Sequence, residues 1–136
     1  MESPRPIEIA LLSVLSPKER AKVLAQAKRQ TYQPGDVVVG EGDPGMYLYF
    51  VMSGRAEVKQ AGQGWVGQLV PGDFFGELAL IEEHGRTATV IAEEELTCML
   101  VPAWEFRALL KEHPELANEL LHALIGRLHR REHHPR

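Results

Sequence analysis

The stretch that decides the fold is residues 75–90, which read FGELALIEEHGRTATV. Leu, Ala and Glu favour helix, so residues 76–80 predict a short helical turn inside a β-rich region. The amino end of such a turn presents free backbone N–H groups, which suit an anion. The Arg86 guanidinium matches phosphate, and the Glu77 carboxylate can accept from a sugar hydroxyl. The segment therefore predicts a donor set for phosphate beside an acceptor for ribose.

Turn signals surround this stretch at spacings of about ten residues. They fall at 35–36, 41–45, 53–54, 61–64 and 71–73. Between them lie runs rich in β-branched and aromatic residues, at 37–39, 46–52, 56–59 and 65–70, and two more follow at 87–92 and 96–101. Short strands at this spacing predict an antiparallel roll, barrel or sandwich.

Helical patterns lie on both sides of the β region. The first runs over residues 7–30, and we expect it to break near Ser16. There Ser16 serves as N-cap, Pro17 takes the first helical position and Glu19 completes a capping box. After residue 102 we expect two helices, the second of which begins at Pro114.

Apolar side chains predict how these last two helices pack. Trp104, Phe106, Leu109 and Leu110 form a face that we expect to cover the roll. The final helix carries a wide stripe at helical spacing, which consists of Leu116, Leu120, Leu121, Leu124, Ile125 and Leu128. The stripe is wider than one contact needs, so a homodimer through this helix is a further expectation.

Length, composition and charge exclude several classes. The chain has 136 residues, which fits one domain over 1–136. The single cysteine, Cys98, excludes an internal disulfide and a Cys-based zinc framework, and it suits a cytoplasmic location. A net charge of −4 argues against direct nucleic-acid binding. No apolar run reaches the roughly 20 residues of a membrane span, and the amino end has no signal-peptide pattern.

The segment FGELAL followed by RTA at 86–88 resembles the phosphate-binding cassette of cyclic-nucleotide-binding domains. Such domains occur in protein kinase A regulatory subunits and in catabolite activator proteins. The resemblance covers nearly the whole chain. It implies a mainly β fold with flanking helices: an antiparallel β-roll, that is, a jelly-roll-like double-stranded β-helix. The N-terminal helices would span 7–30, the roll 31–101 with the cassette at 75–88, and the hinge and lid helices 102–133.

The same resemblance implies a role for each matching residue. Glu77 would accept from the ribose 2′-hydroxyl, and Arg86 would pair with the cyclic phosphate. Leu80 would sense the hinge, and Arg127 on the last helix would approach Glu77 or the base. Val66 and Leu69 would wall the base and ribose. The remaining predicted ligand-binding positions, mostly through their backbone N–H groups, are Phe75, Gly76, Leu78, Ala79, Thr87 and Ala88.

The expected ligand is cAMP or cGMP, and no metal. A threonine after the cassette arginine is compatible with either base, so Thr87 permits both, and the bacterial character of the short chain favours cAMP. Signalling would follow from docking of the C-terminal helices over the pocket. Bacterial transcription factors of this family continue into a DNA-binding domain that these residues do not contain. We therefore expect a stand-alone sensor or a fragment of a longer protein.

Two alternatives remain. Glu82 and Glu83 in the cassette loop would oppose a phosphate if they point inward, which favours a protein-interaction domain that binds no nucleotide. A metalloenzyme of cupin type needs several ligands in the roll, but the roll region holds one histidine, His84. The other histidines are expected to be solvated on helices. Since no nucleophile–base constellation is present in the sequence, we do not expect an enzyme.

Overall fold

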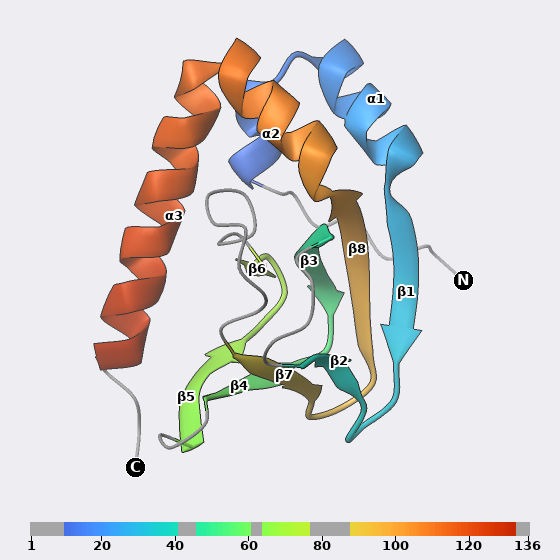
Figure 1. The fold of residues 1–136 in the computed structure, drawn as a ribbon, viewed down its shortest axis with the longest axis vertical. Helices are drawn as coiled ribbons and strands as arrows, with labels where there is room; N and C mark the ends of the chain where they lie inside the picture. The colour runs from blue at the N-terminus through green and yellow to red at the C-terminus, as the bar shows by residue number, and fades with distance from the viewer. Residues whose placement is uncertain (1–9, 41–45, 61–63, 77–87, 133–136) are drawn as a thin grey trace.

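The computed structural model describes residues 10–40, 46–60, 64–76 and 88–132, and it describes the side chains in these ranges except at 10, 65–66 and 127–132. Along the described part of the chain, two helices come first, eight strands follow, and two more helices come last (Figure 1). The helices are η1 (Ala10–Val14), α1 (Pro17–Gln26), α2 (Ala103–Glu112) and α3 (Pro114–Glu132). The strands are β1 (Lys28–Tyr32), β2 (Val37–Val39), β3 (Tyr47–Ser53), β4 (Ala56–Gln60), β5 (Gly64–Leu69), β6 (Phe74–Phe75), β7 (Thr89–Ala92) and β8 (Leu96–Pro102).

The strands form two four-stranded antiparallel sheets. Sheet A has the order β1-β8-β3-β6, and sheet B has the order β2-β7-β4-β5. Helices η1, α1 and α2 lie together at one end of the molecule, and α3 extends from them along one side (Figure 1). The predicted antiparallel β-roll with flanking helices is therefore confirmed.

The two central strands of sheet A, β3 and β8, are buried on both faces. One face, with Leu48 and Phe50 of β3 and Val101 of β8, packs against the helices in a cluster that we call the outer core. The opposite face, with Val51 of β3 and Cys98 of β8, packs against sheet B in the inner core. Because successive side chains of a strand point to opposite faces, each of these strands serves both cores. This is why their sequences are almost continuously apolar.

The amino-terminal prediction is right about the cap and wrong about the helix end. The Ser16 side chain accepts from the Glu19 backbone N–H, and the Glu19 carboxylate accepts from the Ser16 N–H, both at 3.2 Å. The α1 helix, however, ends at Gln26 rather than near residue 30, and Lys28–Tyr32 form β1. Pairing of β1 along β8, in the register Lys28↔Leu100 to Tyr32↔Leu96, overrides the weak helical preference of these residues.

The carboxyl-terminal prediction is confirmed for the helix boundaries and wrong for one side chain. Helix α3 begins at Pro114, and Phe106 of α2 is fully buried in the outer core. Trp104, which was expected to pack on the roll, is 62% exposed. Trp104 lies two residues before Phe106, and positions two apart on a helix lie on different sides.

The apolar stripe of α3 is divided between buried and exposed positions. Leu116 and Leu120 are buried in the outer core, whereas Leu121 and Ile125 are 55% and 45% exposed. The side chain of Leu128 lies outside the described residues.

Candidate functional site

The predicted cassette is described at its two ends only. Its central positions, Glu77, Leu78, Ala79, Leu80, Arg86 and Thr87, lie outside the described residues, as do Glu82 and Glu83. The segment leaves β6 of sheet A at Gly76 and rejoins the described chain at Ala88, just before β7 of sheet B. Residues 77–87 therefore connect one sheet of the roll to the other.

Aromatic packing fixes the first end. Strand β6 pairs with β3 in the register Tyr49↔Phe75 and Phe50↔Phe74. The Phe75 ring stacks on Tyr49, with centroids 4.7 Å apart and planes 10° apart. Phe74 points to the outer core and Phe75 to the inner core. The chain then turns at Gly76 with φ of +91°, a conformation that costs a residue with a side chain about 1–2 kcal/mol.

Strand β7 fixes the second end. It lies between β2 and β4, with Val90 and Ala92 buried in the inner core. Ala88 is half-buried and precedes Thr89, the first residue of β7. Two neighbouring strands therefore hold the carboxyl end of the predicted cassette.

Strand β5 forms an edge of sheet B beside this frame. Leu69 is 2% exposed and belongs to the inner core together with Phe75. The structure thus brings together two of the predicted ligand-binding residues, each packed against other side chains. Val66 lies on β5 and Arg127 on α3, but both side chains lie outside the described part of the chain.

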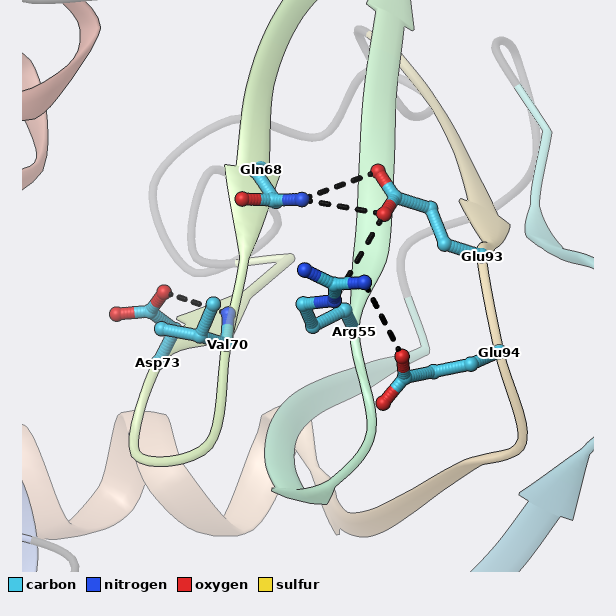
Figure 2. A network of polar contacts seen from close by, with 6 residues as sticks. All are labelled: Arg55, Gln68, Val70, Asp73, Glu93 and Glu94. Carbon is cyan, nitrogen blue, oxygen red and sulfur yellow. Dashed lines mark hydrogen bonds and ion pairs between the residues drawn. The ribbon is translucent and has the colours of Figure 1, made fainter.

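A polar network ties the strands of the frame together at one end of sheet B (Figure 2). Arg55, in the turn before β4, lies 3.9 Å from a Glu93 carboxylate oxygen and 3.3 Å from one of Glu94. The Gln68 side-chain amide of β5 donates to both Glu93 oxygens, at 3.1 and 3.2 Å. The network joins three segments that are distant in sequence. Its charges are half-exposed, so each pair contributes at most about 1 kcal/mol.

Asp73 closes the turn that leads from β5 to β6. Its carboxylate accepts from the Val70 N–H at 2.9 Å, as Figure 2 also shows. The backbone of the same turn is bonded to β3, since Gly72 N–H donates to Val51 O and Val51 N–H donates to Asp73 O, both at 2.9 Å. The turn therefore fixes the position of Phe74 and Phe75 relative to β5.

The interior of the roll is strongly apolar. Burial raises the pKa of the Cys98 thiol to about 12. Burial, with smaller contributions from Tyr49 and Cys98, also raises the pKa of Tyr32 to about 12. These shifts show that the inner core disfavours charge. An anion held against it would need charged or N–H partners, and the predicted cassette is where the sequence supplies them.

Sequence reasoning missed the environment of one histidine. His113 was expected to be solvated, but its side chain is 20% exposed and lies between the carboxylates of Glu19 and Glu115. The three residues are separated by up to about a hundred positions, and their proximity depends on the packing of three helices. The Arg55 network was missed for the same reason, because only the strand register brings its members together.

Two kinds of feature are absent from the described residues. Within them, no group of three or more His, Cys, Asp or Glu side chains could hold a metal ion. None of the helices described is long and apolar enough to cross a bilayer.

With the frame established, comparison with known proteins defines the class. The model of the cyclic nucleotide-binding domain matches residues 29–113, and the chain belongs to this family. That range contains the predicted cassette, helix α2 and both sheets. Only Lys28, the first residue of β1, lies outside it.

Particular relatives follow from the same comparison. The chain is 37% identical over 119 residues to a cAMP-dependent protein kinase regulatory subunit of Schizosaccharomyces pombe, a match that covers 88% of this chain and 29% of the relative. The regulatory subunit of Hypocrea atroviridis is 40% identical over 103 residues, covering 76% and 22%. The chain therefore spans less than a third of these curated relatives. Among solved structures, the Thermus thermophilus catabolite activator protein matches with a TM-score of 0.72 and 29% identity, covering 90% of this chain and 59% of that one.

Proposed function

We propose that this domain binds cAMP in preference to cGMP and acts as a regulatory module, not as an enzyme. The observation that carries the proposal is the position of the two ends of the cassette-like segment. Both of its ends are fixed, one on each sheet of a roll whose family is cyclic nucleotide-binding. Two relatives, 40% and 37% identical to this chain over the matched residues, are named as cAMP-dependent protein kinase regulatory subunits. Their names support the choice of cAMP.

The proposed ligand contacts follow the sequence motif. The Arg86 guanidinium would neutralise the cyclic phosphate, the Glu77 carboxylate would accept from the ribose 2′-hydroxyl, and Thr87 would tolerate either base. Backbone N–H groups of Gly76, Leu78, Ala79, Thr87 and Ala88 would complete the phosphate shell. The apolar inner core would exclude water behind the ligand, and this would strengthen these charge-assisted contacts.

The proposed output runs through the C-terminal helices. Helix α2 follows β8 directly and is fixed to sheet A through Phe106, so a change in the roll reaches α3 through a continuous packed path. Leu121 and Ile125 on α3 are free to gain contacts, either over the pocket, beside Arg127, or with a second copy in a homodimer. A cytoplasmic location agrees with this role and belongs to the same proposal.

Calorimetric titration with cAMP and cGMP tests the proposal directly. We expect saturable binding of cAMP and weaker binding of cGMP. Arg86→Ala should lower cAMP affinity by at least about 10-fold, because a buried phosphate charge would lose its partner. Arg29→Ala is the matched control, since Arg29 is an exposed arginine of β1, and it should bind as the wild type does.

The result also separates the two functional classes. If neither nucleotide binds to a folded wild-type chain, the domain belongs to the class that binds no nucleotide, and Glu82 and Glu83 become the first residues to replace. If both nucleotides bind but Arg86→Ala leaves affinity unchanged, the assignment of the phosphate site is wrong.

A further inference from the structure

The junction between α2 and α3 depends on one residue, His113. Its backbone N–H donates to Leu109 O at 2.8 Å and closes the last turn of α2. Its carbonyl accepts from the Leu116 N–H at 2.9 Å, within the first turn of α3. The angle between the two helices is therefore set around His113.

The His113 imidazole also joins this junction to α1. Its Nε2 atom lies against a carboxylate oxygen of Glu19 on α1, and its Nδ1 atom lies 3.4 Å from Glu115 Oε1 on α3. In the part of the chain that the structure describes, Glu19 and Glu115 are the ion-pair partners of the ring. Lys111 and Glu112, at the end of α2, are exposed. One side chain thus contacts an acid from each of two other helices.

Glu19 is held in place and held ionised. Hydrogen bonding to the carboxylate from the Ser16 backbone N–H, and then from the Ser16 side chain, lowers the pKa of Glu19. Burial partly opposes this, and His113 adds a smaller lowering effect. Since the pKa of Glu19 is lowered from its usual range, this carboxylate stays ionised where an ordinary histidine changes its charge.

The charge of the imidazole decides how strong the three-residue contact is. A neutral ring donates through one nitrogen, and the other nitrogen turns a lone pair toward the second carboxylate. Moreover, Nε2 is buried without a well-aligned hydrogen bond, although the Glu19 oxygen is close. Attraction between opposite charges is therefore the interaction that protonation of the ring would add. A protonated ring attracts both carboxylates.

We propose that His113, Glu19 and Glu115 form an acid-tightened clasp across α1, α2 and α3, and that its protonation is coupled to ligand affinity. The coupling rests on the proposed function, because it requires that α3 moves when nucleotide binds. The clasp is formed in the arrangement in which Leu121 and Ile125 are exposed. Protonation favours this arrangement over one with α3 closed on the roll, so acid lowers affinity.

The test measures the cAMP dissociation constant at pH 8 and at pH 6. In the wild type we expect it to rise by about two- to fivefold at pH 6, the range that a partly exposed ion pair can supply. His113→Gln should show no such rise. His122→Gln is the matched control, because His122 is an exposed histidine of α3, and it should keep the wild-type dependence. The same rise in His113→Gln as in the wild type would overturn the proposal.

A second measurement needs no ligand. The thermal midpoint of the wild type minus that of His113→Gln should be larger at pH 6 than at pH 8, and Glu115→Gln should reduce this gain. An equal difference at both pH values would overturn the clasp itself. If the clasp passes this test and no nucleotide binds at any pH, the proposed function has failed and the clasp has not.

Discussion

The inner and outer cores use the same two strands but serve different purposes. The inner core contains Leu69, Phe75 and Val90, which hold β5 and both ends of the predicted cassette. The outer core contains Phe106, Leu116 and the side chains of η1, which hold the helices. Side chains of β3 and β8 alternate between the two. The site and the helices that would report on it are therefore separated by the thickness of one sheet.

This difference has an energetic consequence. A strand that is buried on both faces cannot shift for one core without disturbing the other, since packed interiors transmit small displacements. We therefore expect the roll and the helices to unfold in a single cooperative transition.

The largest effect should come from removing an aromatic side chain from either core. Phe106→Ala and Phe75→Ala each delete a ring that is at most 5% exposed, and each should cost about 3–5 kcal/mol in free energy of unfolding. Chemical denaturation measures this loss. Trp104 on α2 and Trp65 on β5 are natural probes of the two regions, once each is isolated by replacing the other with Phe.

For both alanine variants, the two tryptophans should report the same denaturation midpoint. Separate midpoints, with the helices melting first in Phe106→Ala, would contradict the view that the shared strands couple the cores.

An intermediate effect is expected at the turn between β3 and β4. Gly54 has φ of +87°, and a Cβ atom there would lie 2.1 Å from the Glu95 carbonyl oxygen. Gly54→Ala should cost about 2 kcal/mol or more, because strain and a backbone clash combine. Gly35→Ala is the matched control, since Gly35 has φ of +90° and open space around it. It should cost only about 1 kcal/mol. If the two variants lose the same amount of thermal stability, the turn at Gly54 relaxes around the added methyl group and the predicted clash is wrong.

The smallest effect concerns a charge beside the outer core. Glu105 of α2 is 8% exposed, and its Oε2 atom has no hydrogen-bond partner. Burial raises the pKa of Glu105, and nearby Lys22 partly offsets this. The folded state therefore holds the proton to higher pH than the unfolded chain does, and the wild type gains stability as pH falls through the folded pKa.

Glu105→Gln lacks this titration. At pH 7 the variant should be more stable than the wild type by less than about 1 kcal/mol, and this advantage should shrink toward pH 5. Denaturant midpoints at both pH values measure the change. Glu112→Gln, on the exposed side of the same helix, should show no such trend. An advantage that is constant with pH would mean that the buried carboxyl is not the titrating group.

Much of the roll could be predicted from local chemistry. The strands β2, β3, β4, β5, β7 and β8 lie where turn residues enclose β-branched and aromatic runs. The capping box at Ser16 and the helix start at Pro114 were also readable, because each depends on neighbours within a few positions. Local signals of this kind need no knowledge of the tertiary structure.

Elements that depend on a distant partner could not be predicted. Strand β1 is polar and exposed along most of its length, and it is a strand because β8 lies beside it, with Thr31 bonded to Thr97 at 3.0 Å. Strand β6 has two residues, too few for any periodicity. At the site, the sequence predicted that Leu69 and Phe75 each contact the ligand. The structure places both in the inner core, and their contact with a ligand remains a prediction. The roles of Glu77 and Arg86 remain predictions.

The strand order also affects how the protein resists self-association. Among the described residues each sheet ends in two edge strands, and an edge that nothing covers can pair with a strand of another molecule. Lys28 and Arg29 place two exposed cations on the β1 edge, while β2 and β6 are only three and two residues long. These three edges are poor templates. The six-residue β5, which carries no formal charge, is the edge from which aggregation of partly unfolded copies would begin.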